Sequence, residues 1–309
     1  MGMELIAFRI PMKVRFRGVS ERCGVLIGGR AGWGEFSPFP EYPPSVAARW
    51  ARAALAAAND GWPRPLRKRI PVNATIPAVG PELAYEMARS SGCKTAKVKV
   101  AEGDDMGRVE AVREALGPDG SIRVDANGMW DTDQAVRNIR NLARFTLEYV
   151  EQPVATLDEM ASVRRQVDVP LAADESVRNA EDPLRIAGLE AADIVVLKVQ
   201  PLGGVQRCLE VAHACGLPVV VSSAVETSIG LASGLALAAA LEELPYACGL
   251  NTLSLLEGDL ADKPFVALNG EIAVRRPEVD PELADRYAPP VELERELKAR
   301  LHEAMEALG

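Results

Sequence analysis

The feature that most constrains the fold of this chain is a regular alternation of short β-like runs with helical stretches along its centre. The runs are rich in Val, Ile, Ala and Leu and have the length of buried strands. They occupy residues 72–76, 96–100, 122–127, 147–153, 170–176, 193–199, 218–223 and, more weakly, 246–250. Helices are predicted over residues 105–116, 132–145, 157–167, 204–215 and 227–242. This alternation predicts βαβ units and a parallel sheet.

A polar residue stands near the end of each of the first seven predicted strands. These residues are Asn73, Lys99, Asp125, Glu151, Asp174, Lys198 and Ser222. Their intervals are 26, 26, 26, 23, 24 and 24 residues, which fits one strand, one helix and two short loops per step. A doubly wound open sheet is the alternative, and it would also place a crevice at the strand ends. Only a closed (β/α)₈-type barrel brings all of these side chains to one point, so the barrel is favoured.

The two flanks of the chain differ from its centre. Residues 1–70 contain predicted strands over 4–13, 23–27 and 32–35 and an Ala-rich helix over 45–58, which indicates an α+β unit. The barrel is expected over residues 71–275. Residues 276–309 carry four prolines and then a charged helix from Glu292, and we expect this tail to pack on the first unit or on the outside of the barrel.

Composition excludes several functional classes. The 309 residues carry 35 Lys and Arg against 44 Asp and Glu, a net charge of −9, which argues against nucleic acid or anionic membrane as a partner. Two histidines cannot supply a zinc cluster, and five scattered cysteines without a CxxC motif indicate reduced thiols. Because the sequence also shows no signal peptide or membrane span, we expect a cytoplasmic protein.

Three carboxylates, Asp125, Glu151 and Asp174, occupy equivalent positions on three consecutive predicted strands. Three acids at one barrel mouth repel one another and are costly to desolvate, and a bound dication would remove both costs. Oxygen ligands alone favour a hard cation, so Mg²⁺ is predicted rather than zinc. Independent salt bridges would explain one such acid but are a poor explanation for three in register.

Lysines flank the predicted acidic cluster. Lys97 and Lys99 are two residues apart on one strand and so face the same side, the barrel interior, whereas Lys198 comes from the opposite side of the ring. A lone buried lysine is commonly just paired to an acid. A lysine beside another lysine and a dication has a lowered pKa and is able to act as a base. Two opposed lysines around a metal suit proton abstraction next to a carboxylate, with the metal neutralising the enediolate.

The chain resembles the enolase superfamily over essentially its whole length, and in particular its muconate-lactonizing-type subgroup with a lysine on each face. The motifs that carry the resemblance are K-x-K at 97–99, V-D-A-N at 124–127, V-E-Q-P at 150–153, A-D-E-S at 173–176 and L-K-V at 197–199. The resemblance implies a (β/α)₇β modified TIM barrel with an N-terminal α+β capping domain completed by the C-terminal tail. It also implies capping loops near residues 17–22 and 39–44.

Within that subgroup the chain is most similar to the o-succinylbenzoate synthases of menaquinone biosynthesis. Further matching segments are Gly32–Pro38, Trp130, Lys198–Gly204, Ser222–Gly230 and Leu253–Leu260. The resemblance implies a hydro-lyase that converts 2-succinyl-6-hydroxy-2,4-cyclohexadiene-1-carboxylate, a small anionic carboxylate, to 2-succinylbenzoate.

Other reactions remain open at the level of the sequence. An N-acylamino acid racemase or a dipeptide epimerase would use the same two lysines, and a lactonising cycloisomerase is a further alternative. Residues 246–255 lack the Asp-x-Asp that dipeptide epimerases of the subgroup tend to carry. A Schiff-base aldolase using Lys198 belongs to another class and would not need the carboxylate trio.

Carried over residue by residue, the resemblance implies that Lys99 abstracts the proton α to the substrate carboxylate and that Lys198 stabilises the anion from the other face. Asp125, Glu151 and Asp174 would hold Mg²⁺, with Mn²⁺ as an alternative. Lys97 would tune Lys99. The remaining substrate-binding or supporting candidates are Arg123, Asn127, Ser222, Ser223, Thr227 and Ser228.

These last candidates have competing explanations. Arg123 either orients substrate or metal ligands or makes a structural ion pair. Ser222, Ser223 and the predicted helix start at Thr227 and Ser228 would bind the succinyl carboxylate through exposed N–H groups. Helix capping alone also explains Thr227 or Ser228.

Overall fold

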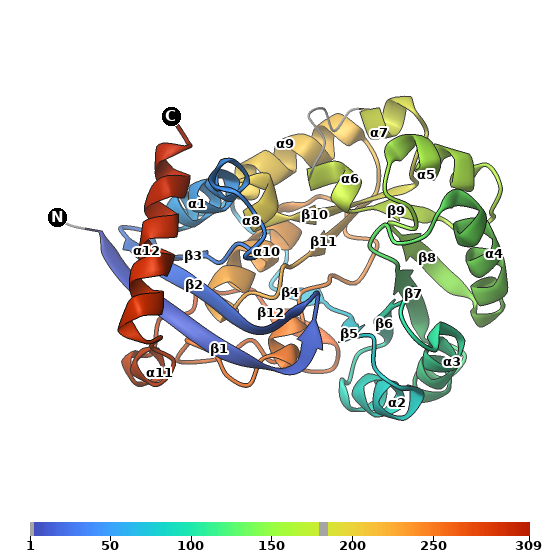
Figure 1. Ribbon diagram of the computed structural model, residues 1–309, viewed down its shortest axis with the longest axis horizontal. Coiled ribbons are helices and arrows are strands. Elements are labelled where there is room, and N and C mark those ends of the chain that lie inside the picture. Colours follow the sequence, from blue (N-terminus) through green and yellow to red (C-terminus); the bar gives the residue numbers. More distant parts are fainter. Residues whose placement is uncertain (1–2, 179–184) are drawn as a thin grey trace.

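The computed structural model describes residues 3–178 and 185–309, and its two larger sheets lie side by side (Figure 1). The first is an antiparallel sheet of β1 (Glu4–Phe16), β2 (Val19–Gly29) and β3 (Gly32–Phe36). Helices α1 (Pro44–Asn59) and α12 (Val291–Glu306) pack beside this sheet and against each other. We call β1–β3, α1 and α12 the cap.

Helix α1 forms because its sequence is Ala-rich and begins with Pro44 at the first turn, where a missing N–H costs nothing. Its buried face includes Trp50 and Ala54 and packs on β3. The approach is so close that a Cβ at Gly34 would lie 1.9 Å from the Ala54 carbonyl oxygen, so this position requires glycine. Leu301 of α12 is buried in the same apolar cluster, so both ends of the chain build the cap.

The second sheet is the barrel. Its strands are all parallel and follow the order of the sequence. They are β5 (Ala74–Ile76), β6 (Thr95–Lys99), β7 (Ser121–Asp125), β8 (Leu147–Glu151), β9 (Leu171–Ala173), β10 (Ile194–Lys198) and β11 (Val219–Ser222). The weak eighth strand appears only as two parallel bridges, Val72 to Cys248 and Ser222 to Gly249, and these close the ring. The predicted modified barrel with an α+β cap is therefore confirmed.

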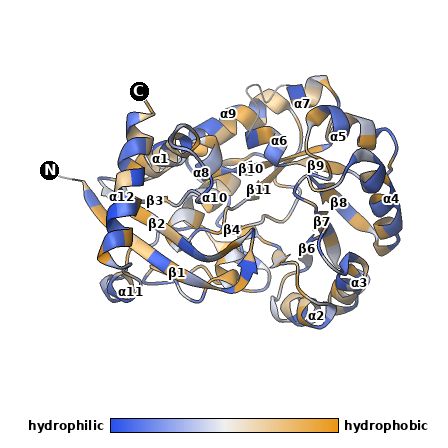
Figure 2. Cartoon of the chain, in the orientation of Figure 1, coloured by the Kyte–Doolittle hydropathy of each residue, from blue (hydrophilic) through white to orange (hydrophobic). Residues whose placement is uncertain are grey.

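Most predicted barrel helices are present with small differences at their ends. They are α3 (Asp105–Leu116), α4 (Thr132–Leu142) followed by η1 (Ala143–Phe145), α5 (Leu157–Arg164), α9 (Val205–Cys215) and α10 (Ser228–Ala240). Helix α2 (Pro81–Ser90) was not predicted; its buried face consists of the small residues Ala84 and Ala88. The helices at the surface carry hydrophilic and hydrophobic residues together, because one face of each helix packs on the protein and the other faces solvent (Figure 2).

Short elements complete the described chain. Strands β4 (Arg69–Pro71) and β12 (Glu271–Ala273) form a two-stranded antiparallel sheet. The short helices are α6 (Glu175–Arg178), α7 (Arg185–Gly188), α8 (Val199–Leu202), η2 (Thr252–Leu255) and α11 (Pro281–Arg286). Among the residues that the model describes, no helix has the length and apolar character needed to cross a membrane.

Helix α10 joins the two units. Its residues from Ser228 to Ala239 are all buried, so it is apolar on every side rather than amphipathic. It contacts β3 of the cap on one side and β11 of the barrel on another. The cap is therefore held over the carboxyl ends of the barrel strands, where the predicted site lies.

Candidate active site

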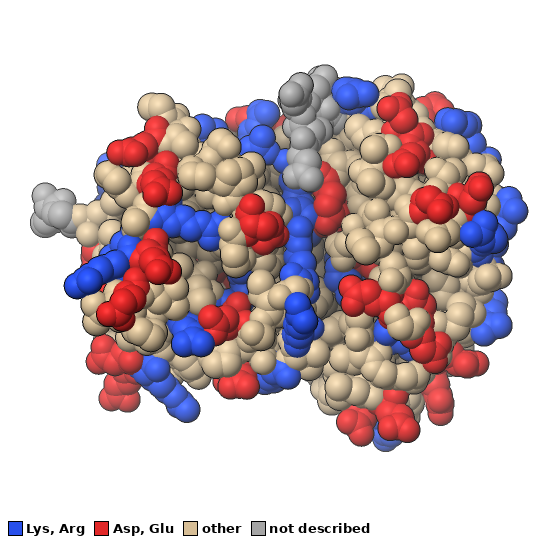
Figure 3. Space-filling model, in the orientation of Figure 1, with Lys and Arg blue, Asp and Glu red and all other residues tan. Residues whose placement is uncertain are grey.

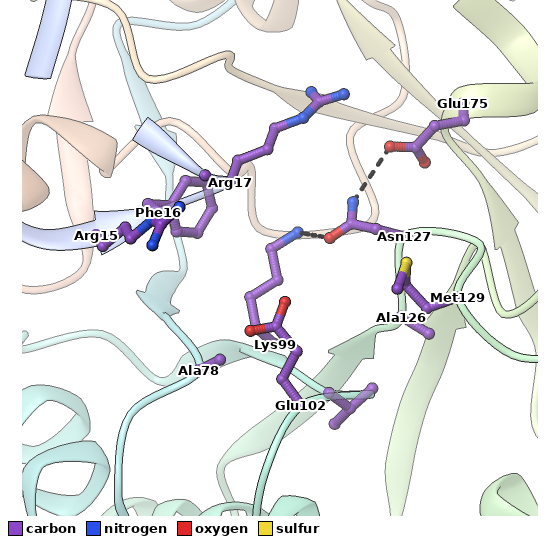
Figure 4. A pocket seen from close by; sticks show the side chains of 12 residues that line it. Arg15, Phe16, Arg17, Ala78, Lys99, Glu102, Ala126, Asn127, Met129 and Glu175 are labelled. Carbon is purple, nitrogen blue, oxygen red and sulfur yellow. Dashed lines mark hydrogen bonds between the residues drawn. The ribbon is translucent and has the colours of Figure 1, made fainter. Parts of the chain in front are cut away.

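A cavity of about 660 Å³ lies between the β1–β2 turn of the cap and the carboxyl ends of β6 and β7. Lys and Arg side chains gather along the hollow between the two halves of the molecule (Figure 3). Arg15 and Arg17 line the cavity from the cap, and Lys99, Asn127 and Glu175 line it from the barrel (Figure 4). The cavity is thus positively lined although the protein as a whole is acidic.

Strand register brings the predicted residues to one level. Lys99 pairs with Asp125 across β6 and β7, and Asp125 pairs with Glu151 across β7 and β8. Asp174 follows β9 directly, and Lys198 is the last residue of β10. For these residues the regular spacing corresponds to similar heights in the barrel, whereas Asn73 precedes β5, whose Thr75 pairs with Lys97, and so lies at the amino end of its strand, away from this level.

Three lysines neutralise the three acids. Lys97 Nζ lies 3.1 Å from Asp125 Oδ2 and 2.6 Å from Glu151 Oε1. Lys99 Nζ lies 2.6 Å from the same Asp125 oxygen. Lys198 Nζ lies 2.5 Å from Asp174 Oδ2 on the other side of the ring. All three carboxylates are at most 1% exposed, so this network is effectively dry.

Burial and charge set the pKa values in this network. Burial lowers the pKa of Lys99, and the charge of Lys97 adds to this effect, while Asp125 opposes it. Burial acts in the same direction on Lys97, but the carboxylates of Glu151 and Asp125 outweigh it and its pKa is raised well above the ordinary value. Burial, reinforced by Asp125, raises the pKa of Glu151 to about 7. Of these two neighbouring lysines, Lys99 is therefore the one whose pKa is lowered.

The acids suit a hard dication. Glu151 Oε2 and Asp174 Oδ1 are buried and have no hydrogen-bond partner among the described residues, although Arg178 Nε lies 3.5 Å from Asp174 Oδ1 as an ion pair. Leaving such oxygens unsatisfied costs roughly 1–3 kcal/mol each, so a ligand for them is expected. As the described side chains stand, no three acidic, His or Cys residues are arranged to hold a metal. The lysines contact Asp125 Oδ2, Glu151 Oε1 and Asp174 Oδ2, and the Asn127 N–H donates to Asp125 Oδ1. The oxygen-only donor set fits Mg²⁺ once these ion pairs open.

Asn127 lies in the site as predicted. Its backbone is left-handed, with φ of 46°, and its side chain accepts a hydrogen bond from Lys99. Its Nδ2 donates to Glu175 Oε1 at 3.2 Å, so the amide lies between a lysine and a carboxylate (Figure 4).

Arg123 does not reach the acidic trio. It is fully buried, and its Nε lies 2.5 Å from Glu148 Oε2 while Nη1 donates to the Ala247 carbonyl at 2.6 Å. Its guanidinium also lies 4.8 Å from the centre of the Tyr149 ring. These contacts agree with the interpretation of Arg123 as a residue in a structural ion pair rather than one that orients substrate or metal ligands.

Ser222 and Ser223 close the barrel. Ser222 bridges to Gly249, and Ser223 Oγ donates to the Gly249 carbonyl at 2.9 Å and lies 2.7 Å from Thr252 Oγ1. Neither belongs to the lining of the cavity described above.

The expectation that Thr227 and Ser228 offer free N–H groups to a substrate is wrong. Thr227 N and Oγ1 donate to Glu35 Oε2 at 3.1 and 2.5 Å. Ser228 N donates to Asp259 Oδ1 at 2.9 Å. The start of α10 is therefore already capped by two buried carboxylates of the protein itself. Glu35 and Asp259 lie inside the matching segments, yet their sequence alone does not show which amides they meet.

Two further residues at the site were not predicted. Glu175 and Arg178 follow Asp174 on α6, and each contacts a residue of the predicted site. The one available signal was that Glu175 lies inside the A-D-E-S motif.

Comparison with known proteins agrees with this geometry. Residues 81–279 match the family model "Enolase C-terminal domain-like" and residues 7–58 match "Enolase N-terminal domain-like". The muconate lactonizing enzyme from Pseudomonas fluorescens has a similar structure, with a TM-score of 0.81 at 21% identity over 93% of this chain and 98% of that one. The N-succinyl Arg/Lys racemase from Bacillus cereus has a TM-score of 0.80 at 23% identity, over 93% and 98%. These two likenesses concern the fold.

Sequence relatives are more specific. The o-succinylbenzoate synthase of Thermobifida fusca is 64% identical over 278 residues, which cover 88% of each chain. The o-succinylbenzoate synthase of Mycolicibacterium smegmatis is 52% identical over 279 residues, which cover 88% of this chain and 86% of that one. Relatives of this kind imply use of a divalent metal and of a small carboxylate substrate. The chain therefore belongs to the enolase superfamily and, within it, to the o-succinylbenzoate synthase family.

Proposed function

We propose that this chain is a Mg²⁺-dependent o-succinylbenzoate synthase. It would dehydrate 2-succinyl-6-hydroxy-2,4-cyclohexadiene-1-carboxylate to 2-succinylbenzoate. The observation that supports this most is the placement of Lys99 and Lys198 on opposite sides of three buried carboxylates beneath a positively lined cavity. We also propose the domain limits 1–70 for the N-terminal part of the cap, 71–275 for the barrel and 276–309 for the tail that completes the cap.

Lys99 is the proposed base. Because burial and Lys97 lower its pKa, its neutral form is more accessible than that of an exposed lysine. It would take the proton on the ring carbon next to the substrate carboxylate. Loss of that proton and of the ring hydroxyl releases water and makes the ring aromatic, so the elimination is easy and modest electrostatic help suffices.

Lys198 is proposed to act from the opposite ring face. As an ammonium paired to Asp174, it would stabilise the negative charge that develops when the proton leaves. Asp125, Glu151 and Asp174 would hold Mg²⁺. When bound, the metal supplies positive charge to the substrate carboxylate. Lys97 would hold Asp125 and Glu151 together and keep Lys99 from gaining a proton.

The test is an assay for dehydration of the cyclohexadiene substrate with Mg²⁺ and after treatment with EDTA. We expect turnover with Mg²⁺ and its loss with EDTA. The parallel measurement is deuterium exchange at the α carbon of N-succinyl amino acids. Faster exchange of these compounds than dehydration would favour an N-acylamino acid racemase and contradict the proposal, as would full dehydration in EDTA.

A further inference from the structure

Arg178, the last residue of α6, is a buried cation outside the set of lysines and carboxylates that the proposed reaction uses. Its Nη2 donates to Glu175 Oε1 at 2.6 Å and its Nη1 donates to Tyr42 Oη at 2.6 Å. Its Nε lies 3.5 Å from Asp174 Oδ1. One guanidinium therefore touches a cap residue, a proposed metal ligand and a carboxylate on the cavity wall.

The Glu175 contact leads to Lys99. Glu175 Oε1 also accepts from Asn127 Nδ2 at 3.2 Å, and Asn127 Oδ1 accepts from Lys99 (Figure 4). A carboxylate only accepts, so Glu175 requires the Asn127 Nδ2 on its side, which leaves Asn127 Oδ1 facing Lys99. Glu175 thus fixes the acceptor oxygen that faces the proposed base. Arg178 in turn fixes Glu175.

The Asp174 contact leads to Lys198. Asp174 Oδ1 faces Arg178, and Oδ2 accepts from Lys198 at 2.5 Å. The same guanidinium is therefore connected to both proposed catalytic lysines by separate routes, to Lys198 through Asp174 alone and to Lys99 through Glu175 and Asn127.

On the cap side, Tyr42 is firmly placed. Its ring lies 6.3 Å from Phe39 and 6.0 Å from Trp50, centre to centre, in the cap's apolar cluster. Its backbone carbonyl accepts from Arg300 of α12 at 3.0 Å. A second cap residue, Arg49 of α1, donates to the Arg178 carbonyl oxygen at 2.6 Å. Arg178 is thus held from the cap at both its side chain and its backbone.

We propose that Arg178 is a positioning residue that couples the docked cap, through Tyr42, to Asn127 and hence to Lys99. A guanidinium suits this role because its planar fork donates in several fixed directions at once, which an ammonium on a flexible stem does not. The kinetic test of this inference rests on the proposed function. The second test, amide hydrogen exchange, does not depend on which substrate the enzyme takes.

Tyr42→Phe removes one cap hydroxyl outside the proposed catalytic set; that hydroxyl accepts from Arg178 at 2.6 Å and from Arg17 of the cavity lining at 3.1 Å, and the double variant with Arg178→Met distinguishes the two contacts. We expect kcat/KM to fall roughly 5- to 30-fold. We expect kcat/KM to fall further in Arg178→Met. In the double variant kcat/KM is expected to be no lower than in Arg178→Met alone, because the two residues belong to one network. Arg178→Lys is expected not to restore activity. The matched control is Tyr85→Phe on α2, whose hydroxyl also accepts from an arginine, Arg89, at 3.2 Å; it should match the wild type.

Hydrogen exchange provides the second readout. In Tyr42→Phe we expect faster amide exchange both in residues 39–43 of the cap and in residues 125–129 around Asn127, with α9 unchanged. A purely local packing role would affect residues 39–43 only. The proposal is overturned if residues 125–129 exchange as in the wild type, or if the kinetic effects of Tyr42→Phe and Arg178→Met simply multiply. Absence of dehydration in the wild type would instead count against the proposed function.

Discussion

Lys97 lies between Asp125 and Glu151, with its Nζ 3.1 Å from the first carboxylate and 2.6 Å from the second. It is the ion that makes two neighbouring buried acids compatible without a metal. The negative charge of the buried carboxylates can therefore be neutralised in two ways, either by the lysines or by a bound dication.

Lys97→Met removes this compensation. Breaking a buried ion pair costs about 3–5 kcal/mol, because it leaves an uncompensated buried charge. We expect the metal-free variant to unfold at a lower temperature than the wild type and Mg²⁺ to raise its Tm more than it raises that of the wild type. Thermal unfolding with and without Mg²⁺ checks this, and an equal Mg²⁺ effect on both proteins would contradict it.

Glu35→Gln tests the buried cap contact. Burial raises the pKa of Glu35 to about 7, with the charge of Glu226 adding to it. A folded-state pKa above the unfolded value means that the folded protein binds this proton more tightly, so stability falls as pH rises from about 4.5 to 7. We expect the variant to lose that part of the pH dependence, about 1–3 kcal/mol. Urea unfolding from pH 4.5 to 8 measures it, and parallel curves for the two proteins would refute the assignment.

Arg123→Met separates structure from catalysis. Because Arg123 contacts Glu148, the Ala247 carbonyl and Tyr149 rather than the acidic trio, its loss is expected to destabilise the barrel by about 2–4 kcal/mol. The folded fraction should keep kcat within a few-fold of the wild type. A loss of kcat of a hundredfold or more in well-folded protein would contradict this prediction and show that Arg123 contributes to catalysis.

The sequence predicts the barrel and its central residues because both follow from periodicity. A strand-to-strand step of about 25 residues puts Lys99, Asp125 and Glu151 at one height, and the pairing of neighbouring strands brings their side chains together. The helix predicted over residues 105–116 coincides with α3, which the structure shows to have Asp104 as its N-cap and Gly117 as its C-cap.

Contacts between distant segments were beyond this reasoning. Glu35 meets Thr227 across 192 residues, and Tyr42 meets Arg178 across 136. Neither pair follows from local propensity or spacing, since each depends on how the cap docks. The N-terminus of α10 was predicted to bind the succinyl carboxylate of the substrate, whereas its N–H groups donate to Glu35 and Asp259 of the protein itself.

The central claim is that Lys99 and Lys198 act together on one substrate from opposite faces. The most direct measurement is the steady-state dehydration rate of Lys99→Ala and Lys198→Ala in saturating Mg²⁺, with circular dichroism to verify folding. General base and electrostatic terms of this kind are worth roughly 10²–10⁴-fold each, so we predict a loss of kcat of at least a hundredfold in both variants. Turnover close to wild type in both would contradict the account.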